Sequence, residues 1–347
     1  MPLSLQCPMP QVDFELITLG HGSGGLLTQK LLESGVFDLF KNEHLDQRHD
    51  GAILNLTGKM AFSTDTFLVS PIRFPGGDIG DLAINGTAND LAMCGAMPRY
   101  FSLSFILEEG LPFAEFWEVL LSLQRAAKAA GIQIVTGDTK VVEKGKGDKI
   151  FINTSGIGQV HPRAHIARER VQVGDVLVLS GPIAAHGMAI MSVREGLEFE
   201  SEIRSDTAAV HHTVSRLLDR FGEHIHLLHD PTRGGLATVL KETAEATRLG
   251  IRLLQSSIPI DEQVSSACEI LGLDPLYVAN EGIFLSIVAA QVAEDYVTTL
   301  RTDPHGTRAA IIGEMVAEHP RQVILRGGIG GERVITMLPG EQLPRIC

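Results

Sequence analysis

The sequence is poor in aromatic residues, in cysteine and in positive charge, and each shortage excludes a class of protein. Aromatic residues make up 5% of the 347 residues, which leaves a core of aliphatic side chains. The four cysteines lie far apart, which excludes a CxxC zinc or redox site and a dense disulfide framework. Lys plus Arg number 29 against 42 Asp plus Glu. The net charge of −13 therefore disfavours nucleic acid and anionic membranes as partners.

Long apolar runs and targeting segments are also missing. No uninterrupted apolar stretch reaches the roughly 18 residues that a membrane span needs. Residues 1–13 lack the basic and apolar regions of a signal peptide. We therefore expect a cytoplasmic protein with no nucleic-acid partner and no membrane partner. Hydrophobic residues at 44% and charged residues at 20% are typical of a folded chain, here long enough for two domains.

Apolar runs and helical stretches alternate along the chain, which predicts an α/β (α+β) fold. In the first half we predict strands over 59–64, 101–107, 132–136 and 151–160, and helices over 80–94 and 112–130. In the second half a strand over 173–179 precedes helical patterns over 206–221, 235–248, 261–271 and 290–302. The first domain closes near residue 160. Residues 334–347 lose the periodicity and predict a mobile tail.

Four aspartates lie at predicted strand ends and turns: Asp50, Asp65, Asp90 and Asp138. Carboxylates at the carboxyl ends of strands point into the crevice where α/β proteins bind ligands. Oxygen ligands without cysteine or paired histidine suit Mg²⁺, which commonly arrives with nucleotide phosphates. The alternative is that these aspartates only cap helices and form turns. The residue pattern alone leaves both interpretations open.

Helical geometry separates the polar residues of the segment 80–94. Asp81, Asn85 and Asn89 recur every four residues and share one face of a helix. Asp90 is nine residues from Asp81 and lies on the opposite side of a straight helix. The two aspartates therefore cannot both bind one metal ion, and the resemblance described below favours Asp90.

Two glycine-rich segments precede helical patterns. Backbone N–H groups of residues 20–25 are able to cradle phosphate, and residues 229–235 offer Arg233 to an anion. The first segment lacks the strand–GxGxxG–helix context of a dinucleotide fold, and the chain contains no GxxxxGK[ST] P-loop. A tight turn followed by a helix cap explains both segments equally well.

The chain ends in a cysteine, Cys347. A thiol on a flexible, proline-containing tail is accessible, and its thiolate is nucleophilic. The last eight residues extend on the order of 26 Å at about 3.3 Å per residue, far enough to enter a neighbouring cleft. The alternative is that the terminal cysteine has no role.

Taken together, several segments resemble a known family. The motif Asp90-x4-Gly95-Ala96-x-Pro98 resembles that of the aminoimidazole ribonucleotide synthetase-like (PurM-like) ATP-binding superfamily, which includes selenophosphate synthetase and thiamine-monophosphate kinase. Five more segments closely resemble the HypE family of hydrogenase maturation proteins: residues 21–25, 137–142, 229–235, 280–282 and 344–347. The likeness runs from about residue 17 to the last residue, with the motifs in the same order.

The resemblance implies a two-domain PurM-like fold with defined boundaries. Residues 1–16 form an N-terminal extension, and residues 17–160 form an ATP-binding domain whose strands build a β-barrel across a homodimer. Residues 170–333 form a C-terminal α/β domain. Residues 334–347 form a flexible tail that ends in Cys347.

The resemblance also implies an activity. HypE-like proteins receive a carbamoyl group on the C-terminal cysteine from a HypF-like carbamoyltransferase. They then dehydrate this S-carboxamide to a thiocyanate, using ATP and Mg²⁺. The cyanide passes to iron on a HypC–HypD complex for the [NiFe]-hydrogenase centre.

The resemblance gives each matched residue an expected role. Cys347 carries the carbamoyl group. Asp65, Asp90 and Asp138 are expected to bind Mg²⁺, and Asp50 is a further candidate. The nucleotide is expected to contact His21, Gly22, Gly24, Asn89 and Thr139.

The resemblance points to both Lys140 and Glu281 as bases that remove the amide protons. A lysine among carboxylates keeps its proton, because opposite charges favour the charged form. We therefore expect Glu281 to be the base and Lys140 to hold phosphate.

Two other functions stay open. A small-molecule phosphotransferase of the same superfamily, such as a selenophosphate synthetase, would use the same acidic residues and leave the tail idle. A non-catalytic scaffold would use the tail only as a docking peptide and bind ATP without turnover. The role of the tail separates the three functions.

Overall fold

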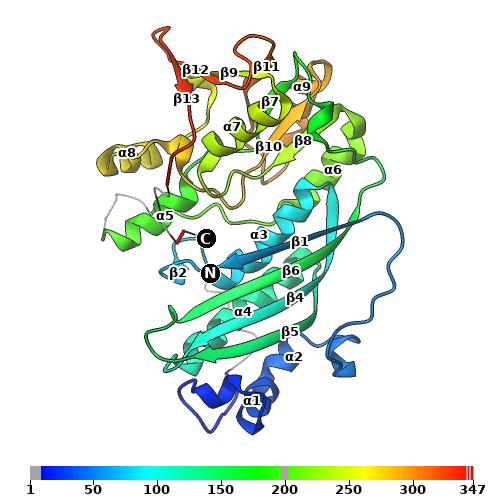
Figure 1. Ribbon diagram of the computed structural model, residues 1–347, viewed down its shortest axis with the longest axis vertical. Helices are drawn as coiled ribbons and strands as arrows, with labels where there is room; N and C mark the ends of the chain where they lie inside the picture. The colour runs from blue at the N-terminus through cyan, green and yellow to red at the C-terminus, as the bar shows by residue number, and fades with distance from the viewer. Residues whose placement is uncertain (1–8, 197–201, 341–342, 344, 347) are drawn as a thin grey trace.

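The chain folds into two α/β units, each built on one sheet (Figure 1). The computed structural model describes residues 9–196, 202–340, 343 and 345–346. This arrangement confirms the predicted mixed α/β fold. None of the helices within these ranges is long and apolar enough to cross a membrane.

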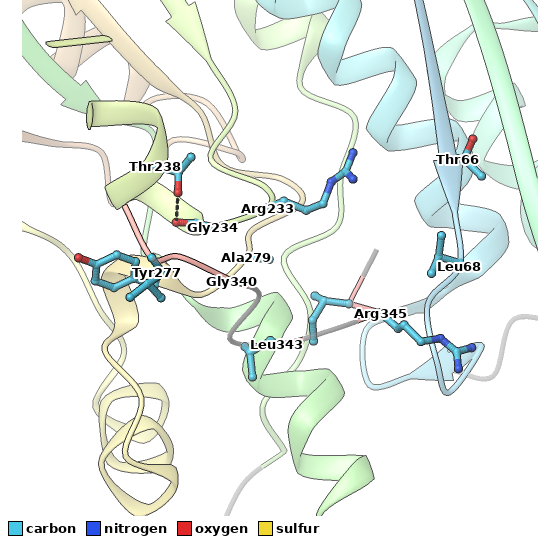
Figure 2. A pocket seen from close by; sticks show the side chains of 12 residues that line it. Thr66, Leu68, Arg233, Gly234, Thr238, Tyr277, Ala279, Gly340, Leu343 and Arg345 are labelled. Carbon is cyan, nitrogen blue, oxygen red and sulfur yellow. Dashed lines mark hydrogen bonds between the residues drawn. The ribbon is translucent and has the colours of Figure 1, made fainter. Parts of the chain in front are cut away.

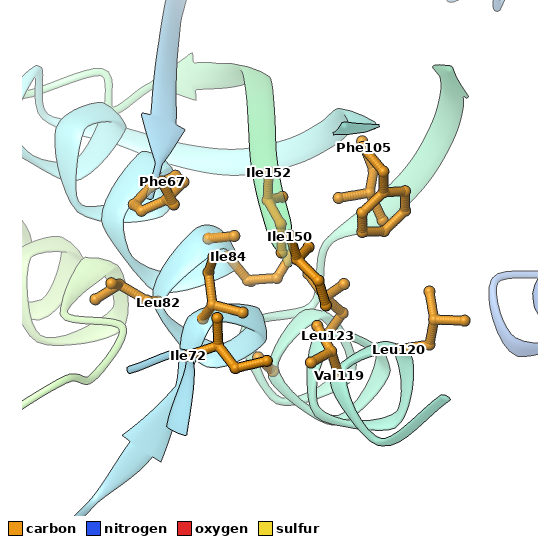
Figure 3. Packing of buried hydrophobic residues seen from close by; sticks show 14 of the residues in the cluster. Phe67, Ile72, Leu82, Ile84, Phe105, Val119, Leu120, Leu123, Ile150 and Ile152 are labelled. Atoms are coloured by element: carbon orange, nitrogen blue, oxygen red, sulfur yellow. The ribbon is translucent and has the colours of Figure 1, made fainter. Parts of the chain in front are cut away.

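The first unit contains a four-stranded sheet in the order β1–β6–β4–β5. Its strands are β1 (Met60–Phe67), β4 (Ala96–Glu108), β5 (Gln133–Val142) and β6 (Ile150–Val160). Only β4 and β5 run parallel. Helices α3 (Ile79–Met93) and α4 (Phe113–Ala130) pack on one face, where aliphatic and phenylalanine side chains interdigitate (Figure 3).

Short elements flank this sheet. Helices α1 (Leu26–Leu31) and α2 (Phe37–Leu39), joined by a π-helical turn, lie near the β5 edge, and the hairpin β2 (Arg73–Phe74) and β3 (Gly77–Asp78) leads into α3 (Figure 1).

The second unit contains a seven-stranded sheet in the order β13–β12–β9–β11–β7–β10–β8. Its strands are β7 (Val176–Leu179), β8 (Ile225–His229), β9 (Gly250–Leu254), β10 (Leu285–Val288), β11 (Ala310–Val316), β12 (Val323–Arg326) and β13 (Glu332–Ile335). Its helices are α5 (Ala185–Arg194), α6 (His211–Phe221), α7 (Gly235–Thr247), α8 (Glu262–Leu271) and α9 (Ala293–Leu300).

Helix α3 is buried on nearly all sides, which places its polar residues between the two units. It contacts β1, β4 and β6 of its own sheet, α4, and also α6 of the second unit. Asp78 caps its N-terminus by accepting hydrogen bonds from the backbone N–H groups of Gly80 (2.7 Å) and Asp81 (3.0 Å). Asp90 lies in the last turn and faces the second unit.

The structure differs from the sequence prediction at several elements, among them β4, which begins at Ala96 and not at residue 101. Strand β5 continues through Asp138 to Val142, because it pairs with β4 along that whole stretch. The helix predicted from residue 206 begins only at His211. No element was predicted over the residues of helix α5. Strand β13 includes Val334 and Ile335, which we had assigned to the tail, since Ile335 pairs with β12 and is buried.

Candidate active site

Four carboxyl groups from both units gather at the inner end of α3, and we call them the acidic junction: Asp65, Asp90, Asp230 and Glu281. Asp65 lies on β1, Asp90 in α3, Asp230 directly after β8, and Glu281 in the loop before β10. Segments far apart in the chain therefore build one site. Asp230 belongs to a segment that the family motifs had marked, although its role had stayed open.

Mutual repulsion and burial shape the protonation of this junction. Burial, followed by the charges of Asp230 and Asp65, raises the pKa of Asp90 to about 7. Burial also raises the pKa of Asp230 to about 6, with a contribution from Asp65. Arg233 is a partial counter-charge at Asp65, but burial and mutual repulsion still disfavour the charged carboxylates, and such a site favours a cation.

Asp81 lies outside the acidic junction. Burial and the charge of Asp78 raise the pKa of Asp81 to about 7, and the charge of Arg125 opposes them. Asp90 instead responds to Asp230 of the second unit. Asp81 and Asp90 therefore have different charged neighbours, and their placement on opposite sides of the helix stays a prediction.

Glu281 is held by its backbone and keeps a free carboxyl oxygen. The side chain is buried, and Oε1 has no hydrogen-bond partner among the described residues. Its backbone N–H donates to Asp206 Oδ2 (3.0 Å), and its carbonyl accepts from Asn89 Nδ2 (2.9 Å). Burial and the neighbouring charges, Asp206 first among them, raise its pKa well above the usual value. A carboxylate in this setting is a stronger base than one in water.

Asn89 holds backbone groups of the second unit, and its predicted nucleotide contact stays a prediction. Its Nδ2 donates both to Glu281 and to the carbonyl of Ala208 (2.9 Å), and its Oδ1 accepts from the backbone of Val210 (2.9 Å). Both amide hydrogens are used inside the chain. These bonds bind the backbone of residues 208–210, which lie outside the helix, and this explains why α6 starts later than predicted.

The first glycine-rich segment borders a separate cavity of about 310 Å³, which we call the glycine pocket. Gly22, Gly24, Asp138, Thr139 and Lys140 line its polar side, and Phe37, Phe40, Leu103, Phe105 and Ile134 line its apolar side. A Cβ atom on Gly22 would lie 2.3 Å from the backbone nitrogen of Val141, so only glycine allows this close packing on β5. Its neighbour His21 is buried and bonds Thr18 through Nδ1.

Asp138 and Lys140 form an ion pair in this pocket. Lys140 Nζ lies 2.7 Å from both carboxylate oxygens of Asp138, and this hydrogen bonding lowers the pKa of Asp138. The pair is exposed to solvent, unlike the acidic junction.

The predicted ligand set does not converge within one chain. Across the sheet, Asp138 pairs with Ser104, which pairs with Asn153, which pairs with Thr66. Asp138 and Thr66 are therefore three strand spacings apart, or about 14 Å. Asp65 pairs with the next row and faces α3, whereas Asp138 faces the other side of the sheet. Asp50 lies exposed in the loop before β1 and is absent from the charges acting on the junction. Local strand patterns cannot show this separation.

The junction fits a phosphate-bound magnesium ion. No group of three or more His, Cys, Asp or Glu side chains in the described ranges forms a ready-made metal cage. Mg²⁺ does not need one, because it keeps several waters and binds one or two carboxylates together with substrate phosphates. Asp65, Asp90 and Asp230 supply hard oxygen ligands of the kind that Mg²⁺ prefers.

The described residues of the tail line a cleft of about 290 Å³ beside β1 (Figure 2). Thr66 and Leu68 form one wall, and Arg233 reaches towards them from the second unit, with its guanidinium 3.9 Å from Asp65. Ile346 is only 3% exposed. Cys347 lies outside the described residues, and its carrier role stays a prediction.

The backbone and the charge of Arg345 fix the tail in this cleft. Its carbonyl accepts a hydrogen bond from the backbone N–H of Ser70 (3.2 Å) and another from Arg194. Its guanidinium pairs with Asp148. The tail predicted to be mobile therefore has one specific docked position in this structure.

Comparisons with known proteins match the whole arrangement. The family of AIR synthase related proteins matches residues 48–160 with its N-terminal domain and residues 172–326 with its C-terminal domain. The carbamoyl dehydratase HypE of Azotobacter vinelandii is 48% identical over 95% of this chain and 97% of its own length. A crystal structure of the hydrogenase maturation protein HypE in complex with ATP has a TM-score of 0.91 at 45% identity, covering 95% of this chain and 99% of that one. HypE in a HypE–HypF complex has a TM-score of 0.78 at 42% identity, covering 89% and 99%.

Proposed function

The chain belongs to the family of HypE carbamoyl dehydratases, and we propose that it dehydrates an S-carboxamide on its own Cys347 to a thiocyanate at the expense of ATP. The docked tail carries this proposal. Ile346, one residue before Cys347, is buried in a cleft that shares β1 and Arg233 with the acidic junction. A phosphotransferase acting on a free small molecule has no use for such a tail.

The reaction needs a phosphate acceptor and a base. The amide oxygen of the S-carboxamide takes the γ-phosphoryl group of ATP, the C–O bond breaks, and the nitrogen gives up two protons. The products are the thiocyanate, ADP and phosphate, so the oxygen of the lost water ends in phosphate. Converting the oxygen into a phosphate ester is required because an amide oxygen is a poor leaving group.

Glu281 is the base in this proposal. Its unpaired Oε1 and raised pKa support the role. Lys140 lies in the glycine pocket against Asp138, which supports phosphate binding and argues against proton abstraction beside Glu281.

We expect ATP to contact two regions, the glycine pocket of the N-terminal domain and the acidic junction between the two units. The apolar wall of the glycine pocket accepts the base, and its backbone N–H groups and Lys140 accept phosphates. Asp65, Asp90 and Asp230 hold Mg²⁺, which supplies charge neutralisation to the phosphates.

We infer a homodimer that brings these regions together. Asp138 faces away from the acidic junction of its own chain, on the outer face of the sheet, so it is placed to serve the junction of a partner copy. Phe62 and Ile106 on β1 and β4 are 67% and 44% exposed, and the predicted intersubunit barrel would cover them.

The carbamoyl group comes from a HypF-like carbamoyltransferase in this proposal, in keeping with the solved HypE–HypF complex of a relative. The cyanide acceptor is a HypC–HypD complex, which family resemblance supports. The carrier chemistry requires contact with both partners near the tail cleft.

Intact-mass measurement tests the function. The protein is incubated with the carbamoyltransferase, carbamoyl phosphate and Mg-ATP, with Cys347→Ala as control. We expect one carbamoyl adduct that then loses one water only when the ATP is hydrolysable, and no adduct on the variant. An unmodified Cys347 beside steady ATP turnover on an added small molecule would establish a phosphotransferase. The absence of both the adduct and ATP turnover would indicate a non-catalytic scaffold.

A further inference from the structure

Helix α5 contributes a buried histidine, His186, that contacts the docked tail. The side chain is fully buried, and its Nε2 lies 2.9 Å from the carbonyl oxygen of Ile346. The ring of Phe74 packs edge-on against it, with centroids 5.4 Å apart and an interplanar angle of 89°. None of the roles proposed above uses this histidine.

The two hydrogen-bond partners of His186 fix which nitrogen carries the proton. A carbonyl oxygen only accepts, so Nε2–H donates to Ile346. Nδ1 lies 2.8 Å from Ser205 Oγ and accepts its hydroxyl proton in the neutral ring. Burial lowers the pKa of His186, against the opposing charge of Asp206, which favours this neutral form.

The segment that orients His186 also holds the Glu281 loop. The backbone N–H of Ser205 donates to Pro75 (2.8 Å), and its Oγ accepts from the backbone of Thr207 (3.0 Å). Its neighbour Asp206 accepts from the backbone N–H of Glu281 (3.0 Å). The anchor for the tail and the support for the base are therefore consecutive residues.

We propose that His186 is a positioning residue that anchors the inserted tail through the Ile346 carbonyl, the last peptide group before Cys347. The inference rests on the proposed function, because the position of Cys347 matters only if it carries the reacting group. The hydrogen bonds from Ser70 and Arg194 act on the carbonyl of Arg345, one peptide earlier. His186 thus binds the carbonyl of Ile346, the described tail group nearest to Cys347 in the chain. Ser205 fixes the imidazole ring from its other side.

Alkylation of Cys347 in the full-length protein measures tail release without ATP or a carbamoyl donor. Timed labelling with iodoacetamide, followed by cleavage after Glu341, isolates a C-terminal peptide that contains no other cysteine. We expect His186→Ala to raise the labelling rate about tenfold, the effect of losing one well-placed hydrogen bond. His186→Gln keeps an N–H donor near the place of Nε2 and is expected to stay within about twofold of wild type.

A matched control lies on the same helix. Ser192 is nearly buried, and its Oγ donates within α5 to Ala189 (2.8 Å), so Ser192→Ala removes a side-chain hydrogen bond away from the Ile346 carbonyl. We expect the wild-type labelling rate. If His186→Ala does not fold, His186→Leu replaces it, because leucine fills the space without a donor.

The outcomes separate anchoring from packing and from function. If Cys347 is labelled at the wild-type rate in His186→Ala, or in His186→Leu where that replaces it, the proposal is overturned. Equal acceleration in His186→Gln and in that variant also overturns it, since packing would then hold the tail. Because labelling needs no ATP, failure of wild type to form a thiocyanate would refute the function and leave the labelling rates intact as a test of the anchor.

Discussion

Asp90 offers a quantitative test of the acidic junction through the pH dependence of stability. Its pKa is raised from 3.8 to about 7, by burial first and by Asp230 and Asp65 after that. The folded state therefore binds this proton more tightly than the unfolded state. The stability that the proton provides is fully present below pH 3.8 and is lost as the pH rises through about 7. A shift of this size corresponds to at most about 4 kcal/mol at 1.36 kcal/mol per pKa unit.

Asp90→Asn removes the charge and keeps the shape. Asparagine still offers an oxygen to Ser63 Oγ, which donates to Asp90 Oδ2 across 2.6 Å. We expect the free energy of unfolding to rise by about 2–3 kcal/mol at pH 8, because the three acids share their repulsion and no single one carries the full cost. At pH 5, where Asp90 is already protonated, we expect a gain below about 1 kcal/mol.

Urea unfolding at pH 5 and pH 8, without Mg²⁺ or nucleotide, measures both values. The matched control is Asp138→Asn, in which an exposed carboxylate with a lowered pKa loses its partner Lys140 and no gain at pH 8 is expected. A loss of stability in Asp90→Asn at pH 8, or an equal gain at both pH values, would refute the reasoning. The same variant should lose the extra stability that Mg-ATP gives to wild type at pH 8.

Two further predictions concern the base and the nucleotide. Glu281→Gln should keep the carbamoyl adduct on the protein yet lose dehydration by at least about 100-fold, whereas Lys140→Arg should retain it; the reverse pattern in intact-mass time courses would make Lys140 the base. Gly22→Ala should weaken ATP binding at least about tenfold in calorimetry, because the new Cβ would lie 2.3 Å from a β5 backbone nitrogen. Gly25→Ala is the control, since a Cβ there meets no atom within 4 Å, and equal weakening in both variants would contradict the glycine-pocket assignment.

Local sequence patterns predicted the elements whose cause is local. Helix α4 ends at Gly131 in the left-handed conformation (φ 68°), as the glycine stop indicated, and its start at Phe113 is one residue from the predicted Pro112. The opposite placement predicted for Asp81 and Asp90 follows from 3.6 residues per turn and needs no knowledge of the neighbours.

Features with a distant cause escaped prediction. The sequence before His211 predicts a helix, yet hydrogen bonds with Asn89, more than a hundred positions away, hold its backbone outside the helix. In this arrangement Asp206 accepts a hydrogen bond from the backbone of Glu281. Motif resemblance marked Glu281 and passed over Asp206 and His186, because they stand outside the matched segments and act only through tertiary contacts.

The separation of the site into parts gives the reaction its order. The acidic junction alone is electrostatically unfavourable, since its carboxyls raise one another's pKa values. Mg²⁺ held by Asp65, Asp90 and Asp230 would offset part of that charge, and a cation there would lower the pKa of Glu281 and favour its carboxylate form. The base therefore becomes competent when the phosphoryl donor is in place, and the docked tail supplies the third component. Without that cation, burial and the neighbouring carboxyls raise the pKa of Glu281 and favour its protonated form. We therefore expect proton abstraction to depend on bound Mg-ATP.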